Sequence, residues 1–155
     1  MCRRTMSNFD VRVCEARNLP SVAALSGKPV AYVVATTSEG CSQRTESFEP
    51  ATTSPQWEHV MKFRTTKAPD TDAVDFVVYH KRLLGSDLRI GHAAVPLALL
   101  ERGVVRDEWM PIIDGDACAQ GHLRIRIIAH DFGRVAPVYP VAPLAPPQGY
   151  ALPRQ

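Results

Sequence analysis

Short runs of alternating apolar and polar residues recur along most of the chain. Phe9, Val11 and Val13 alternate with polar neighbours, and this period of two places apolar side chains on one face of a strand. Turn-forming Gly, Pro, Ser and Asp residues separate the runs, and no long helical period is present. The pattern predicts an all-β, eight-stranded antiparallel β-sandwich. Its strands are expected near residues 9–14, 30–35, 43–48, 57–64, 74–80, 88–95, 108–113 and 122–130.

The composition changes after Gly133. Residues 134–155 contain six of the thirteen prolines, and Pro137, Pro140, Pro143 and Pro146 recur at every third position. This is the period of a polyproline II helix, and such a segment forms neither a helix nor a sheet. We therefore predict an N-terminal arm at 1–7, a folded domain at 8–133 and a proline-rich tail at 134–155.

The predicted tail has the chemistry of a docking segment. Residues 134–140, RVAPVYP, fit the basic-x-x-Pro-x-x-Pro form that SH3-type domains bind. Apolar side chains between the prolines suit a groove, either of a partner or of the chain's own domain. The predicted partner-binding residues are Arg134, Pro137, Tyr139, Pro140, Pro143, Leu144, Pro146 and Tyr150.

Composition narrows the function classes. The net charge of +2 over 155 residues, without a basic stretch that carries aromatics, argues against nucleic-acid binding. No apolar run has the length of a membrane helix, and the N-terminal residues lack an apolar signal core. The four cysteines form no C-x-x-C pair, which argues against a zinc site and a disulfide framework. We expect a reduced, cytoplasmic protein, with cytoskeletal or membrane association left open.

Catalytic patterns are missing from the sequence. The five histidines lie at scattered positions, and we find no nucleophile elbow, metal-ligand pair or phosphate-binding glycine loop. His130 and Asp131 are neighbours on a predicted strand, so their side chains point to opposite faces. We predict a non-enzymatic protein without a cofactor.

Several motifs, in order along the chain, resemble those of the C2 domain family. They are VRVCEARNLP at 11–20, GKPVAYV at 27–33, TTSPQWE at 52–58 with its Glu one residue early, Ile90-Gly91, Pro96-Leu97, Trp109 and Gly121. The resemblance covers roughly residues 8–131. It implies a C2-type sandwich, with a strand order similar to that of the phospholipase-type members of the family.

The same resemblance bears on calcium. Many C2 domains bind calcium between loops at one end of the sandwich, through about five aspartates, because this ion needs several oxygen ligands. The corresponding places in this chain are occupied by residues without a carboxylate, and Asp87 lies one position from the last of them. The resemblance therefore implies calcium independence. The five places are Ala24, Val30, His80, Arg82 and Leu88.

The loop end is basic where metal-binding members of the family are acidic. Lys28, His80, Lys81, Arg82 and Arg89 are candidates to bind a phosphate of a lipid headgroup or of a phosphorylated partner. The alternative is a set of solvated surface charges, because short stretches of mixed charge are usually only surface.

The tip of that loop leaves a second question open. Leu83 and Leu84 either insert into a bilayer or a partner, or fold back over the edge of the core.

The outer faces of the first and last strands carry three arginines. Arg12, Arg124 and Arg126 are either ordinary exposed charges or, if the two strands share a sheet, a basic stripe for an acidic partner.

Together these features predict an adaptor or assembly component. We expect it to bind protein partners through its tail and the sandwich surface, without calcium or nucleic acid. The alternative is a peripheral membrane module that binds anionic phospholipid through the basic loop end.

Overall fold

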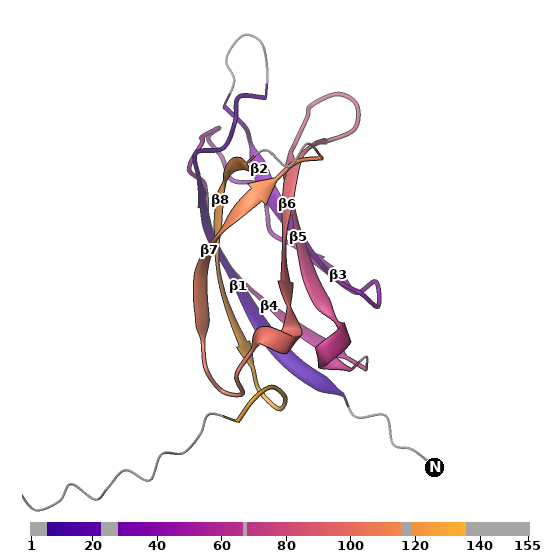
Figure 1. The fold of residues 1–155 in the computed structure, drawn as a ribbon. Coiled ribbons are helices and arrows are strands. Elements are labelled where there is room, and N and C mark those ends of the chain that lie inside the picture. Colours follow the sequence, from indigo (N-terminus) through magenta and orange to yellow (C-terminus); the bar gives the residue numbers. More distant parts are fainter. Residues whose placement is uncertain (1–5, 23–27, 67, 116–118, 136–155) are drawn as a thin grey trace, which may run out of the picture.

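The computed structural model describes residues 6–22, 28–66, 68–115 and 119–135. Eight antiparallel strands form the framework of this region (Figure 1), so the predicted all-β fold is confirmed. The strands are β1 Ser7–Arg17, β2 Ala31–Thr37, β3 Ser42–Arg44, β4 Gln56–Thr65, β5 Ala73–His80, β6 Leu88–Pro96, β7 Arg106–Ile113 and β8 Ala119–Ala129. Two short 3-10 turns, η1 Pro69–Thr71 and η2 Leu97–Leu99, precede β5 and follow β6.

The strands form two layers that face each other. Their order is β3-β2-β5-β6-β7-β8-β1-β4, and the sheet folds over between β6 and β7. These two strands pair through the single residue pair His92 and Ile113. Gly91 lies beside this junction, and a Cβ atom there would come within 2.8 Å of the Ile113 carbonyl oxygen. The junction therefore needs a residue without a side chain at position 91.

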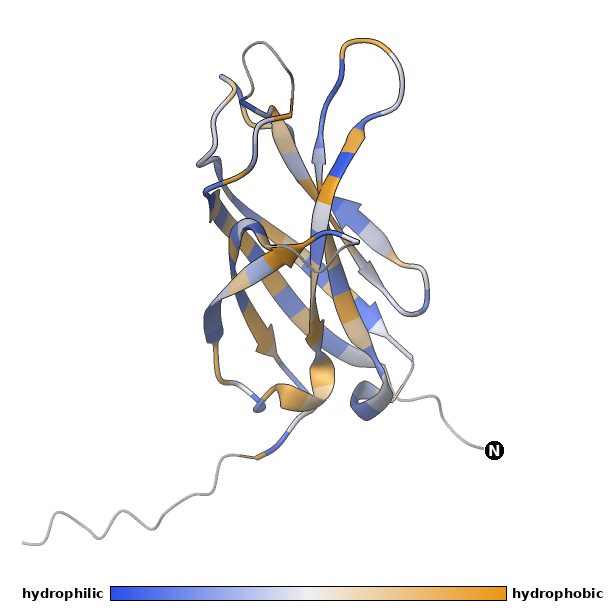
Figure 2. Cartoon of the chain, turned by 45° about the horizontal axis from the view of Figure 1, so that its top comes forward, coloured by the Kyte–Doolittle hydropathy of each residue, from blue (hydrophilic) through white to orange (hydrophobic). Residues whose placement is uncertain are grey.

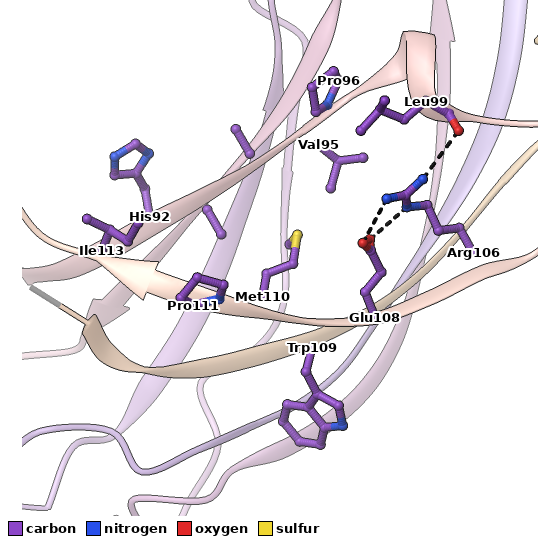
Figure 3. Close-up of a pocket in the computed structure, with 12 residues that line it drawn as sticks. His92, Val95, Pro96, Leu99, Arg106, Glu108, Trp109, Met110, Pro111 and Ile113 are labelled. Carbon is purple, nitrogen blue, oxygen red and sulfur yellow. Dashed lines mark hydrogen bonds and ion pairs between the residues drawn. The ribbon is translucent and has the colours of Figure 1, made fainter. Parts of the chain in front are cut away.

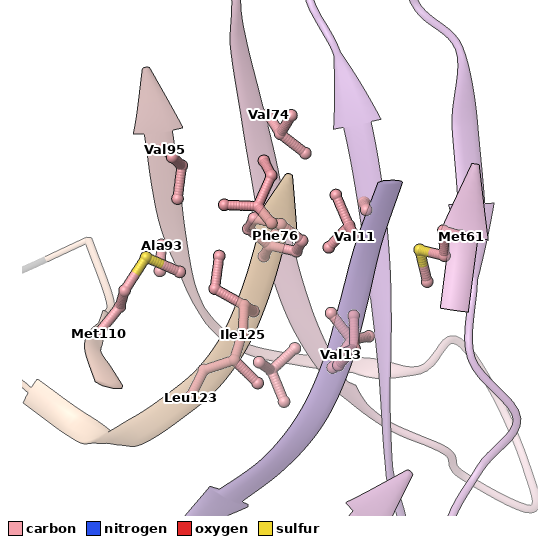
Figure 4. Close-up of a cluster of buried hydrophobic side chains, with 14 of the residues drawn as sticks. Val11, Val13, Met61, Val74, Phe76, Ala93, Val95, Met110, Leu123 and Ile125 are labelled. Carbon is pink, nitrogen blue, oxygen red and sulfur yellow. The ribbon is translucent and has the colours of Figure 1, made fainter. Parts of the chain in front are cut away.

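The core lies between the two layers. Alternate residues of the strands point inward, as Figure 4 shows for Val11 and Val13 of β1 and for Phe76 of β5. The inward residues of β8 that alternation predicts, Leu123 among them, are also buried. Each such side chain contributes about 1.5–3 kcal/mol through removal of apolar surface from water. The hydrophobic pattern thus accounts for which face of each strand packs.

The third strand is shorter than the predicted 43–48. β3 ends at Arg44 because the hydroxyl of buried Thr45 accepts a hydrogen bond, 3.0 Å long, from the Val33 amide. A side-chain oxygen therefore occupies the place of a backbone carbonyl, and the regular ladder stops.

Cys14 also departs from simple alternation. Alternation from Val13 would place it on the outward face of β1, but it is buried, at a β-bulge where the registers of β1 with β4 and with β8 both shift. Glu58 takes the left-handed conformation there, with φ of 47°. The Glu that stands one residue early in the family motif is thus part of a bulge.

The chain remains attached to the sandwich just beyond β8. Phe132 is buried and packs edge-on against Phe9, with ring centroids 6.1 Å apart. The Arg134 amide donates to the Leu100 carbonyl, and the Arg134 carbonyl accepts a hydrogen bond from the Arg102 amide. The other predicted partner-binding residues lie outside the described residues; these are Pro137, Tyr139, Pro140, Pro143, Leu144, Pro146 and Tyr150.

Candidate functional site

The loop between β5 and β6, residues 81–87, carries the most exposed apolar side chains of the described chain. Leu83 is 100% exposed and Leu84 is 89% exposed, so the fold-back interpretation is wrong. Lys81 and Arg82 precede them and are exposed as well. In Figure 2 this loop projects beyond the sandwich, with an apolar tip between hydrophilic segments. We call Leu83 and Leu84 the leucine tip.

One carboxylate holds the two ends of this loop together. Asp87 Oδ1 accepts a hydrogen bond of 3.1 Å from the Arg82 amide, across the loop. Its Oδ2 accepts a hydrogen bond of 2.5 Å from the Tyr32 hydroxyl at the start of β2. Both oxygens of Asp87 are therefore engaged within the protein.

Tyr32 is itself held in place by the sheet. It is buried, and its ring stacks on that of Tyr79, its partner in the register of β2 and β5, at 5.4 Å between centroids. The Arg44 guanidinium covers the ring at 4.2 Å. Burial and the hydrogen bond to Asp87 raise the pKa of Tyr32 to about 12. The Tyr32 hydroxyl and the Arg82 amide lower the pKa of Asp87, so a neutral phenol donates to an ionised carboxylate.

The other end of the loop is tied to β2 as well. His80 Nδ1 accepts a hydrogen bond of 3.0 Å from the Val30 amide. The Lys81 amide donates to the Val30 carbonyl at 2.9 Å. Because Nδ1 is an acceptor, the neutral His80 ring carries its proton on Nε2.

A hollow of about 510 Å³ lies at the foot of the leucine tip. It brings together three of the predicted anion-binding residues, His80, Lys81 and Arg82, and adds the carboxylate of Glu49. Lys28 and Arg89 are exposed but do not line it. Glu49 and Asp87 were expected from the sequence to dilute this basic patch, and Glu49, from another loop, does line the hollow.

The places that correspond to calcium ligands in calcium-binding C2 domains carry other contacts here. Val30 and His80 bond to each other, Arg82 bonds to Asp87 through its amide, and Leu88 is half-buried at the start of β6. Ala24 lies outside the described residues. Within the described ranges, no group of three or more His, Cys, Asp or Glu side chains could hold a metal ion. Calcium independence stays a prediction.

A second hollow lies between β6 and β7, where the two layers separate (Figure 3). It measures about 320 Å³ and is lined mainly by apolar side chains such as Val95, Leu99 and Met110. Arg106 closes one end with an ion pair of 2.7 Å to Glu108 and a hydrogen bond to the Leu99 carbonyl. Glu108 raises the pKa of Arg106, and Arg106 lowers that of Glu108. No sequence signal pointed to this groove, because the separation of two strands creates it.

The three outer-face arginines do share one sheet, but they do not form a basic stripe. Arg124 and Arg126 both bond to Asp107, at 2.9 and 3.0 Å, and Arg12 lies 3.5 Å from Glu58. The two arginines, Arg124 first, lower the pKa of Asp107 to about 2. Acidic residues of β1, β4 and β7 pair with these arginines, so the arginines are ordinary paired surface charges, the first of the two alternatives.

The side chains of His130 and Asp131 make their close contacts with different residues of β1. The His130 ring lies 3.1 Å from Asp10 on β1, and the Asp131 carboxylate accepts hydrogen bonds from the amide and the side chain of Asn8. Both contacts hold the ends of β1 and β8 together. Both residues lie just beyond the end of β8, so the strand alternation predicted for them does not apply.

The family model described as "C2 domain" matches residues 7–112. The chain belongs to the C2 domain family. A comparison with curated proteins finds no match.

Solved structures of C2 domains share the fold. The C2A domain of plant extended synaptotagmin 1 superposes with a TM-score of 0.75 at 20% identity, over 84% of this chain and 98% of that one. Human GIVD cytosolic phospholipase A2 gives a TM-score of 0.72 at 18% identity, over 85% of this chain but only 17% of its own. The SMP, C2A and C2B domains of extended synaptotagmin 2 give 0.66 at 17% identity, over 81% of this chain and 28% of that one. These similarities establish the C2 fold.

Proposed function

We propose that this C2 domain is a non-enzymatic peripheral membrane module that attaches to anionic phospholipid through its β5–β6 loop, without calcium. The observation that carries the proposal is the fully exposed leucine tip directly after Lys81 and Arg82. An anionic bilayer has a negatively charged surface over an apolar interior. Lys81 and Arg82 match the surface, and Leu83 and Leu84 at the tip match the interior. We therefore prefer the peripheral membrane module, which was the alternative from the sequence, over the adaptor.

The expected energies suit a reversible attachment. Burial of two exposed leucines contributes about 1.5–3 kcal/mol each. Each lysine or arginine close to an anionic membrane adds about 1 kcal/mol. Glu49 and Asp87 lie beside the basic residues and reduce the second contribution. We therefore expect moderate affinity, in which the leucine tip contributes more than the charge.

The related structures support a membrane role. One is a cytosolic phospholipase A2, named for its action on phospholipid, and others are extended synaptotagmins. No helix within the described residues is long and apolar enough to cross a membrane. By analogy with the cytosolic phospholipase A2, the proposed place of attachment is the cytoplasmic face of a membrane.

Vesicle sedimentation tests this function. The full chain should bind vesicles of phosphatidylcholine and phosphatidylserine at physiological salt, with calcium chelated. Leu83→Ser with Leu84→Ser should abolish most binding, and Lys81→Glu with Arg82→Glu should weaken it and make it less dependent on salt.

Two matched controls separate the loop from general surface effects. Leu99 is an exposed leucine on η2, and Lys62 is an exposed lysine on β4. Leu99→Ser and Lys62→Glu should bind as the wild type does. Equal binding by the leucine-tip variant and the wild type would contradict the proposal.

A second candidate function is protein docking through the proline-rich tail. The sequence observation behind it is the repeat of proline at 137, 140, 143 and 146, a spacing that pre-forms a ligand for an aromatic-lined groove. Affinity capture with the full chain and with a chain ending at residue 135 tests it. This end point keeps Phe132 and the backbone contacts of Arg134. Partners that are captured equally by both chains would contradict docking through the tail.

A further inference from the structure

The β5–β6 loop is held by contacts within the protein at each of its ends. Asp87 joins the Arg82 amide to the Tyr32 hydroxyl, and Val30 joins His80 to the Lys81 amide. The Tyr32 ring is fixed in turn by Tyr79 and Arg44. The position of the loop is therefore determined by β2 and β5 without a bound ligand.

Such support matters for an apolar loop tip. An unsupported loop would lose conformational entropy when each of its residues becomes ordered on a membrane surface. In water, its leucines would also pack against other apolar groups. A loop that is already ordered has lost this entropy during folding. More of the free energy of burying the leucines in lipid then contributes to affinity.

We propose that Asp87 and Tyr32 form an internal clamp that keeps the leucine tip exposed without a metal ion, so that lipid attachment is constitutive rather than switched by calcium. This inference rests on the proposed membrane function. Asp87 and Tyr32 are positioning residues in it, since both oxygens of Asp87 face the protein and the Tyr32 ring is buried.

Charge provides a way to separate the clamp from simple electrostatics. Asp87→Asn removes a negative charge beside Lys81 and Arg82, so electrostatic attraction alone predicts stronger binding to an anionic vesicle. Loss of the clamp predicts weaker binding. Tyr32→Phe removes only the hydroxyl and keeps the ring stack on Tyr79, so it changes no charge at neutral pH.

The first measurement needs no lipid. Hydrogen exchange at the Arg82 amide reports directly on its bond to Asp87. We expect this amide to exchange about tenfold faster in Asp87→Asn and several-fold faster in Tyr32→Phe, because a charge-assisted hydrogen bond is lost or loosened. Asp70→Asn makes the same charge change on an exposed residue of η1, at the opposite end of β5, and should leave this exchange unchanged.

The second measurement is partition to phosphatidylcholine and phosphatidylserine vesicles in a calcium chelator. Both clamp variants should partition about three- to tenfold less than the wild type, as expected for a loop that must be ordered on binding. Asp70→Asn should partition as the wild type or slightly better. Addition of millimolar calcium should change none of these values.

The outcomes distinguish the clamp from the function on which it rests. Unchanged Arg82 exchange in both variants overturns the clamp, whatever the vesicles show. Faster exchange with equal or stronger partition overturns its role in lipid attachment, and so does calcium-enhanced partition of the wild type. If a leucine-tip variant binds vesicles as the wild type does, the membrane function itself is wrong. Hydrogen exchange at the Arg82 amide still tests the clamp in that case.

Discussion

Gly91 gives a test of how the two layers are joined. A Cβ atom at this position would lie 2.8 Å from Ile112 Cγ2, 2.8 Å from the Ile113 carbonyl oxygen and 3.1 Å from its carbonyl carbon. Ile112 is fully buried, and Ile113 pairs with His92 to join β7 to β6, so neither residue can move freely. Gly91→Ala must push β7 away from β6.

The magnitude follows from the overpacking. An extra methyl group in a closely packed site costs about 1–3 kcal/mol, and part of the cost here is distortion of backbone rather than of a side chain. In a domain of this size, each kcal/mol lowers Tm by about 4 °C. We therefore expect a loss of about 4–12 °C in Tm, with a corresponding fall in the urea midpoint and an unchanged m-value.

Gly115→Ala is the matched control. Nothing lies within 4 Å of a Cβ atom built at Gly115. Alanine restricts the unfolded chain more than glycine does, so this variant should be neutral or stabilised by up to about 1 kcal/mol. If Gly91→Ala unfolds at the wild-type urea concentration, the close approach of β6 and β7 does not contribute to stability, and our account of the junction is wrong.

Two further predictions concern the loop end. Millimolar calcium should not raise Tm, since a metal that binds the native state must stabilise it and the ligand places are Ala24, Val30, His80, Arg82 and Leu88; a clear rise in differential scanning calorimetry would contradict this. Absorbance at 295 nm should show a tyrosine that titrates near pH 12 and is missing in Tyr32→Phe. Because the pKa of Tyr32 is raised above its usual 10, its contribution to stability is complete below pH 10 and is lost as pH rises toward 12. An unchanged titration curve in Tyr32→Phe would contradict the assignment.

The strands were predictable because their residues repeat a local rule. Val74, Phe76 and Val78 face the core and their neighbours do not, and this follows from the pleat alone. The structure departs from this alternation where a residue far away in the sequence changes the hydrogen bonding or the register of a strand. Thr45 ends β3 by bonding to Val33, and Cys14 is buried at a bulge where the registers of β1 with β4 and β8 both shift.

The site was predictable in part. The sequence located Lys81 and Arg82 in a loop at the end of a strand, because Gly85, Ser86 and Asp87 follow them. It could not show that Asp87 bonds to Tyr32, which is 55 positions away. That contact depends on the register of β2 with β5, and register is set by the packing of whole strands.

The clamp also explains why the position of the leucine tip was ambiguous from sequence. A free loop that contains Leu83 and Leu84 would bury them against the nearest apolar surface, with a gain of about 1.5–3 kcal/mol for each. The bonds at both loop ends restrict the path of the residues between them, and in our proposal this restriction keeps Leu83 and Leu84 exposed. A change in those supporting residues should therefore alter membrane attachment while the tip sequence stays the same, which makes the loop ends as decisive for the proposed function as the side chains that enter the lipid.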